Sequence, residues 1–426
     1  MQLALFLLFL LIALGLPIAA VLGLLAVALD LALSSFPLQR AFGEIAWSHS
    51  IDFVLIAIPM FIMMGEIMLR SQMADRMYRG VSAWIGWLPG GLMHANIGAS
   101  ALFAATSGSS VATAATIGTT AMPQVDRHGY NERLFLGSLA AGGTLGILIP
   151  PSINMIIYGF LTDTSVPRLF VAGLVPGILL ALIFVVTILT LCLIVPSWGG
   201  QKAPMSRERL WRSLPDLAPP LGLFLVVIGS IYAGWATPTE AASIGVIAAL
   251  GLAAMYRELS WPMLVEVFIG TIRTSSMMIL ITLLAFLLNF VIGATGLVSS
   301  VNTFVSGLDW SPLATLLVIL CVYLVLGMFM DTLAMIVLTI PIVTPIVVGL
   351  GYDAIWFGVM MVLVAETSVL TPPIGMLCYV VHGIRGRGEL QDVFIGVAPF
   401  IVALMVMIGL MISMPQLALW LPNLLY

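Results

Sequence analysis

The chain is a succession of long apolar segments that short groups of polar residues, glycines and prolines interrupt. A helix needs about 20 mostly apolar residues to cross a bilayer. Seven runs broadly reach that length: 3–33, 51–69, 169–195, 217–235, 241–255, 275–292 and 393–414. The first run is expected to make two passes broken near Gly15-Leu16-Pro17. Its counterpart, 217–255, is long enough for two passes around Thr237–Glu240. The pattern therefore predicts a polytopic helical membrane protein.

Two further segments have a different pattern. Residues 74–87 and 261–271 mix Arg or Glu with Trp, Tyr and Phe. This mixture is typical of amphipathic helices that lie along a membrane surface. We expect both to lie at the inner interface.

The interruptions of the apolar pattern occur twice along the chain. Pro123-Gln124-Val125 returns as Pro345-Ile346-Val347, an offset of about 222 from position 123 to 345, and Pro150-Pro151 returns as Pro372-Pro373. Matching Gly/Pro-interrupted segments in two halves of a membrane chain indicate a transporter's binding site. We therefore predict two repeats, 1–196 and 217–426, joined by a polar cytoplasmic linker at 197–216.

Composition supports a membrane protein and excludes several other classes. Of 426 residues, 61% are hydrophobic and 8% are charged, against about 25% charged in a soluble domain. The net charge of −4 is spread thinly, which argues against a nucleic-acid partner. The three cysteines stand singly in apolar stretches, so we interpret them as packing residues rather than a disulfide framework or a metal site.

The positions of Lys and Arg predict the orientation. Suppose that each half has about five crossings and one hairpin that enters and leaves on the same side, and that the N-terminus is outside. Of the 15 Lys and Arg residues, all but Arg40 and Arg168 then lie inside, as the positive-inside rule requires. An odd number of crossings inverts the second copy, and both termini are predicted to be periplasmic.

A polar interruption in each half, rich in hydroxyls only in the first, predicts a re-entrant helical hairpin. In hairpin 1, about 92–123, the tip is Ser107–Ser110; in hairpin 2, about 312–348, it includes Gly327, Met330, Asp331 and Thr332. The apolar arms of hairpin 1 are too short to cross separately. Non-helical backbone at membrane depth is tolerated only against protein or a water-filled cavity, so the tips should line a cavity.

Each hairpin is followed by a predicted helix that unwinds in its middle. These helices are 133–161, broken by Gly142-Gly143 to Ser152, and 354–384, broken by Glu366 to Gly375. Proline supplies no backbone donor and glycine permits unusual φ angles. The freed carbonyls suit a hard cation such as Na+, and the positive start of a half-helix suits a carboxylate.

Two acidic residues lie at membrane depth in the second half. An ionisable residue there costs at least ~2.5 kcal/mol on insertion scales, so Asp331 and Glu366 are functional candidates by default. Asp331 could balance the charge of a bound cation. Against this, a single Ser or Thr often only bonds to its own backbone, and a single Gly often serves close helix packing. The recurrence of whole clusters at one offset favours binding.

At these residues the chain resembles the large membrane (M) subunit of tripartite ATP-independent periplasmic (TRAP) transporters, over essentially its whole length. The combination of motifs is specific, although each piece alone is weak. The motifs are Ala74-Asp75-Arg76, Leu88-Pro89-Gly90-Gly91, Ser107-Gly108-Ser109-Ser110-Val111-Ala112, Ile149-Pro150-Pro151-Ser152-Ile153 with Tyr158-Gly159, Ala236-Thr237-Pro238-Thr239-Glu240-Ala241-Ala242 and Thr371-Pro372-Pro373-Ile374-Gly375.

The resemblance implies a Na+-driven importer in the bacterial inner membrane that carries a carboxylate-bearing solute, such as a sialic acid, a sugar acid or a C4-dicarboxylate. It implies an elevator motion, two or more Na+ ions, a small membrane (Q) subunit, expected as a separate polypeptide, and a periplasmic substrate-binding (P) protein. By position, one Na+ site would comprise Ser107, Gly108, Ser109, Gly143 and Pro150. The second would comprise Gly327, Met330, Asp331, Thr332, Thr367 and Thr371. The substrate cavity would involve Ser110, Thr144, Ser152, Glu366, Pro372 and Gly375.

Other functions stay open to different degrees. The nearest rival is a stand-alone Na+-coupled carboxylate or anion carrier of related inverted-repeat design. An enzyme is not expected, because Ser109 has no His or Lys partner at membrane depth and the sequence has no Asp-rich metal motif. A passive channel would not need four broken helices in antisymmetric positions.

Overall fold

The computed structural model describes residues 2–34, 37–200, 206–297, 299, 301, 303, 307 and 309–426. Within these residues the protein is helical, with a single isolated β-bridge between Tyr130 and Gly199 and no strand. Eight helical segments in this part of the chain are long and apolar enough to cross a membrane. The chain is therefore a multi-pass membrane protein, as its composition predicts.

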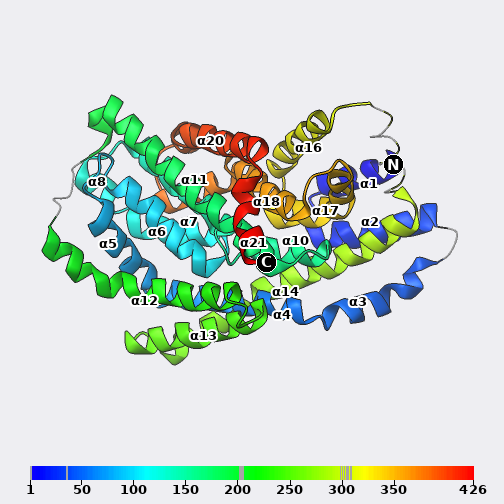
Figure 1. Cartoon of the computed structure of the whole chain (residues 1–426), viewed down its shortest axis with the longest axis horizontal. Coiled ribbons are helices and arrows are strands. Elements are labelled where there is room, and N and C mark those ends of the chain that lie inside the picture. Colours follow the sequence, from blue (N-terminus) through cyan, green and yellow to red (C-terminus); the bar gives the residue numbers. More distant parts are fainter. Residues whose placement is uncertain are drawn as a thin grey trace.

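One group of helices, which we call the outer helices, comes from the start of each half. It comprises α1 (Gln2–Ala13), α2 (Ile18–Leu33), α3 (Phe42–Ser50), α4 (Phe53–Arg70), α5 (Met73–Ile85), α12 (Arg207–Tyr232), α13 (Pro238–Met255) and α14 (Trp261–Ala294), with a short 3-10 turn η1 (Leu38–Ala41). Helix α13 packs against α4, and α14 packs against α2 and α4. In Figure 1, α3, α4, α12 and α13 run along the lower side of the molecule.

The inner helices follow in each half and carry the predicted site. They are α6 (Leu92–Ser107), α7 (Ser110–Ala121), α8 (Gln124–His128), α9 (Glu132–Leu148), α10 (Ile153–Leu161), α11 (Val166–Ile194), α16 (Pro312–Gly327), α17 (Thr332–Gly349), α18 (Ala354–Leu370), α19 (Met376–Arg385), α20 (Leu390–Ser413) and α21 (Gln416–Leu425), with a 3-10 turn η2 (Pro196–Trp198). Helix α9 contacts α6, α7, α18 and α20. It therefore joins the two halves of the chain.

Two segments picked out by their polarity continue into long helices. The expected linker 197–216 is already helical from Arg207, where α12 begins, while 201–205 lie outside the described residues. A polar composition does not stop a helix, and the Glu208–Arg212 ion pair at 2.6 Å supports its first turns. The predicted interfacial segment 261–271 is not a separate helix, because α14 continues without a break to Ala294.

Helices α9 and α20 cross at a pair of glycines. A Cβ atom built on Gly137 would lie 2.0 Å from the carbonyl oxygen of Gly396, and one on Gly396 would lie 1.9 Å from the carbonyl oxygen of Arg133. Only residues without a side chain allow backbones to approach this closely. This contact fixes α9 against α20.

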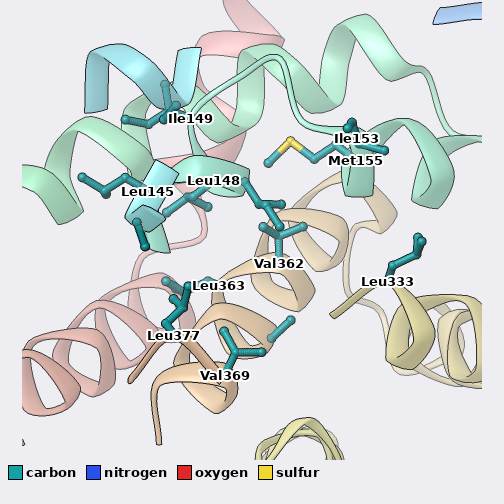
Figure 2. Close-up of a cluster of buried hydrophobic side chains, with 14 of the residues drawn as sticks. Leu145, Leu148, Ile149, Ile153, Met155, Leu333, Val362, Leu363, Val369 and Leu377 are labelled. Atoms are coloured by element: carbon teal, nitrogen blue, oxygen red, sulfur yellow. The ribbon is translucent and has the colours of Figure 1, made fainter. Parts of the chain in front are cut away.

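Apolar side chains fill the space around the interrupted helices. Figure 2 shows Leu145 and Leu148 of α9 close to Leu363 and Val362 of α18, with Leu377 of α19 beside them. All five are fully buried. Because protein interiors are close-packed and transmit strain, this core holds the polar breaks of the two halves in a fixed relation.

Candidate functional site

The inner helices are interrupted at four places, each of which lies within a cluster picked out from the sequence. The two breaks in the unwound helices are shorter than predicted, because 142–148 still belong to α9 and 366–370 to α18. Glycines and hydroxyl side chains are tolerated inside a packed helix, and the helix ends only close to the Pro-Pro pair. Helix α6 ends at Ser107 and α7 begins at Ser110, while α16 ends at Gly327 and α17 begins at Thr332. Helix α9 gives way to α10 across 149–152, and α18 gives way to α19 across 371–375. Four new helix N-termini therefore arise inside the apolar part of the chain.

Side chains at the breaks cap the N-termini of three of these helices. Ser109 Oγ accepts a hydrogen bond from the Ala112 amide at 3.3 Å, and Ser152 Oγ accepts one from Met155 at 3.3 Å. Asp331 Oδ2 accepts one from Leu333 at 3.2 Å. Each is an N-cap, which satisfies one of the free amides at a helix start. The fourth helix, α19, follows Gly375, whose φ of 60° favours glycine.

All four helix starts meet at one cavity of about 60 Å³, which has room for roughly four to six water-sized spheres. Its walls come from both hairpin tips, both broken helices and α14. The wall residues are Gly108, Ser109, Ser110, Val111, Ile147, Ile153, Asn154, Met278, Asp331, Thr332, Leu333, Val369, Met376 and Leu377. Among these described residues, no Lys or Arg lines the cavity. The partial positive charge that faces it comes from the helix ends.

A second cavity of about 100 Å³ adjoins the first and shares Ser109, Ile153 and Met278 with it. It extends from hairpin tip 1 to Glu66 on α4. Glu66 bonds Arg70 at 3.0 Å, and Arg70 also pairs with Glu266. The second cavity thus lies between the tip of hairpin 1 and the outer helices α4 and α14, beside the close contact of Ser107 with Gly65.

The residues of the first predicted Na+ site lie close together. A Cβ on Gly108 would lie 3.0 Å from the carbonyl oxygen of Pro151, and one on Gly143 would lie 3.2 Å from that of Ser110. Ser107 Oγ is 3.0 Å from Thr113 Oγ1, and the Thr113 hydroxyl donates to the carbonyl of Ser109 at 2.7 Å. Tip 1 therefore rests on the broken part of α9 and α10 and concentrates hydroxyl and carbonyl oxygens there.

The second predicted Na+ site is assembled less tightly. A Cβ on Gly327 would lie 1.9 Å from Ser368 Oγ, so the end of α16 touches α18. Asp331 lies on the cavity wall, whereas the hydroxyls of Thr367 and Thr371 donate to the carbonyls of Leu363 and Thr367 at 2.8 and 2.6 Å. Met330 is half-buried beside Asp331.

Two buried hydrogen bonds join the halves directly beside these tips. Ser110 Oγ donates to Glu366 Oε1 at 2.8 Å, and Asn154 Nδ2 donates to Thr332 Oγ1 at 3.0 Å. All four residues are at most 4% exposed. The other carboxylate oxygen of Glu366, Oε2, is buried without a hydrogen-bond partner.

Comparison with known proteins identifies the family. Residues 5–417 match the family described as tripartite ATP-independent periplasmic transporter, DctM component. The chain belongs to this family. It is therefore a large permease subunit of the TRAP class, a class of secondary solute transporters, as its sequence motifs predict.

Individual relatives agree over almost the whole chain. The permease is 37% identical to the C4-dicarboxylate TRAP transporter large permease protein DctM of Pseudomonas aeruginosa, over 93% of this chain and 92% of that protein. It is 31% identical to the sialic acid TRAP transporter large permease protein SiaM of Vibrio cholerae, over 92% and 90%. Both relatives are transporter permeases rather than enzymes.

A solved structure shares the fold. The permease superposes on the YdaH transporter of Alcanivorax borkumensis with a TM-score of 0.66, covering 94% of this chain and 98% of that one. The sequence identity is 13%, so this likeness concerns the fold alone.

Of the residues predicted to form the substrate cavity in this permease, Ser110 lies on the cavity wall. Thr144, Ser152 and Glu366 are buried outside both cavities, with the Thr144 hydroxyl donating to the Ala141 carbonyl at 2.6 Å. Pro372 is exposed and Gly375 is buried, and neither lines the two cavities. Their role in substrate binding stays a prediction.

Sequence reasoning missed two residues of this site. A Cβ on Gly146 would lie 2.6 Å from the carbonyl oxygen of Ser109, so this glycine admits tip 1 to α9. Asn154 lies on the cavity wall and bonds hairpin 2. The available signal for Asn154 was an amide side chain directly after Ser152-Ile153 in an otherwise apolar helix.

Proposed function

We propose that this permease mediates Na+-coupled uptake of a carboxylate-bearing solute across the bacterial inner membrane. It would act with a small membrane (Q) subunit and a periplasmic substrate-binding (P) protein. The observation that carries the proposal is the convergence of four helix N-termini, two from each half, on one cavity.

The helix ends favour an anionic solute. Each N-terminus carries roughly half a positive charge in its free amides, and such ends bind carboxylates and phosphates readily. The cavity has room for one small polar group, so a carboxylate could occupy it while the rest of the solute extends into the adjoining cavity.

Asp331 gives a reason for a co-bound cation. Its carboxylate lies on the same wall and would repel a carboxylate solute, unless a cation neutralised it. Hydroxyl and carbonyl oxygens are hard donors that suit Na+, and Ser107, Ser109 and the carbonyls of Ser110 and Pro151 supply them at tip 1. Among the residues that the structure describes, no three His, Cys, Asp or Glu side chains form a cluster, which leaves a transition-metal site unsupported.

The matching order of helices supports an inverted repeat with an elevator motion. A broken hairpin, a broken helix and a long helix follow one another in each half, as α6 to α11 and as α16 to α20. In the proposed motion the inner helices carry the site past the outer helices, which stay fixed. We propose periplasmic termini for the same topology.

The solute class is supported by the relatives. The relatives' printed solutes, a C4-dicarboxylate and a sialic acid, share a carboxylate, which is the group that the four helix ends would bind. We propose that the carboxylate is recognised here, and that the remainder of the solute is selected by the P protein.

Uptake by reconstituted protein tests this function. Proteoliposomes that hold the permease and its Q subunit would be given radiolabelled succinate or sialic acid, with and without the P protein and an inward Na+ gradient. We expect uptake only with both. Uptake without the P protein would favour the stand-alone carrier, and uptake that ignores Na+ would contradict the coupling.

A further inference from the structure

The two buried hydrogen bonds beside the tips start from equivalent positions of hairpins 1 and 2. Ser110 is the first helical residue after the N-cap Ser109 at tip 1, and Thr332 is the first after the N-cap Asp331 at tip 2. Each forms one buried bond to the broken helix of the opposite half. The contacts are therefore reciprocal: tip 1 to α18, and α10 to tip 2.

We propose that these two bonds couple the two predicted Na+ sites, so that occupation of one site raises the affinity of the other. This inference rests on the proposed function, because it needs Na+ at both tips. Ser110, Glu366 and Asn154 would act as positioning residues, which orient the tips rather than hold the ions themselves. Asn154 would orient the predicted Na+ ligand Thr332 through its hydroxyl.

The coupling follows from where the bonds lie. Ser110 directly follows the predicted ligands Ser107 to Ser109, so an ion that orders tip 1 also fixes the Ser110 hydroxyl. That hydroxyl holds Glu366, which precedes the predicted ligand Thr367 of the other site. Asn154 follows the break at Pro150 and Pro151, and holds Thr332 beside Asp331. Coupling between two binding events is necessarily reciprocal.

Burial makes the links stiff and their loss measurable. Ser110 and Glu366 are 4% and 1% exposed, and Asn154 and Thr332 are 3% and 4% exposed. Both bonds are therefore shielded from bulk solvent, although Ser110, Asn154 and Thr332 also line the cavity. Removing one buried hydrogen bond commonly shifts an equilibrium by roughly 3- to 10-fold, which sets the expected size of the effect.

Direct Na+ binding tests the proposal without a solute. The full-length permease with its Q subunit would be purified, and binding of 22Na+ would be measured over a range of Na+ concentrations by scintillation proximity. We expect a Hill coefficient above one for the wild type. In Ser110→Ala and in Asn154→Leu it should fall toward one, with the half-saturating Na+ concentration raised roughly 3- to 10-fold.

Two further variants separate coupling from a general loss of packing. Ser138→Ala removes a buried hydroxyl that accepts from Asn96 Nδ2 at 2.8 Å within one half, away from both tips. Ser138→Ala should keep the wild-type 22Na+ binding isotherm even if it lowers the melting temperature. Glu366→Gln retains an oxygen that can accept from Ser110, so it should keep the Hill coefficient above one.

The outcomes distinguish the two proposals. If the wild type binds no 22Na+ saturably, the Na+ coupling in the proposed function fails, and this inference fails with it. If the wild type binds cooperatively and folded Ser110→Ala and Asn154→Leu bind identically to it, only this inference is overturned. A loss of cooperativity in Ser138→Ala as well would also overturn it, because the effect would then not be specific to the inter-half bonds.

Discussion

The crossing of α9 and α20 predicts a strong effect from one methyl group. In Gly137→Ala the new Cβ would lie 2.0 Å from the carbonyl oxygen of Gly396 and 2.3 Å from its carbon. Both are backbone atoms that no side-chain rotation can remove. Since Cβ atoms essentially never approach a heavy atom within 3.0 Å, the helices must separate by about 1 Å or more.

The cost of that separation can be placed within limits. Overpacking a tight contact typically costs about 1–3 kcal/mol, occasionally more. A Gly-to-Ala change inside a helix returns up to about 1 kcal/mol through helix propensity. Because both clashing atoms belong to a backbone, we expect the upper part of the range and a net loss of about 2 kcal/mol.

The assay is thermal unfolding of the purified permease with its Q subunit in detergent. A loss of this size should lower Tm by at least about 3 °C. Gly251→Ala is the matched control, since Gly251 lies inside α13 and has no heavy atom within 4 Å of the built Cβ. We expect its Tm to be unchanged or slightly raised. A Tm of Gly137→Ala equal to that of Gly251→Ala would refute the backbone contact.

Two further predictions concern charges. Asp331→Asn keeps an oxygen that can cap α17 but removes the negative charge. The Na+ concentration for half-maximal uptake should therefore rise roughly tenfold, equivalent to about 1.4 kcal/mol, while Tm stays nearly constant. An unchanged Na+ requirement would remove Asp331 from the mechanism. Arg385→Ala should lower Tm more than Arg387→Ala. The Arg385 side chain is 6% exposed and forms ion pairs with Glu132 at 2.8 Å and with Asp392 at 3.0 Å. The Arg387 side chain is 54% exposed and reaches Glu132 at 3.4 Å. Equal melting temperatures would contradict a stabilising role for this ion-pair cluster.

The helix breaks could be predicted because their causes are local. Pro150-Pro151 and Pro372-Pro373 cannot continue a helical hydrogen-bond ladder, and Ser109 and Asp331 start new helices as caps. Polarity was a poorer guide. Charged residues made 197–216 look like a linker, although helices tolerate charges, and the last part of that segment is the start of α12.

The contacts that define the site could not be predicted in this way. Ser110 and Glu366 are 256 positions apart, and Asn154 and Thr332 are 178 apart. Neither distance follows from the repeat offset, because each bond joins non-equivalent parts of the two copies. The role of Gly146 could not be predicted either, since the need for a glycine there follows only from the packing of Ser109 against it.

The predicted repeat and the differences between its two copies would make separate contributions to this site. The shared plan supplies two tips and two broken helices, and hence the four helix ends around the cavity. The side chains then make the tips unlike: tip 1 is uncharged and largely buried, with Ser107 against Gly65 of α4, while tip 2 carries Asp331 and is more exposed. A symmetric pair of acidic tips would place two negative charges beside four helix ends and would compete with an anionic solute. Under the proposed function, one acidic tip would leave the cavity able to attract both a cation and a carboxylate.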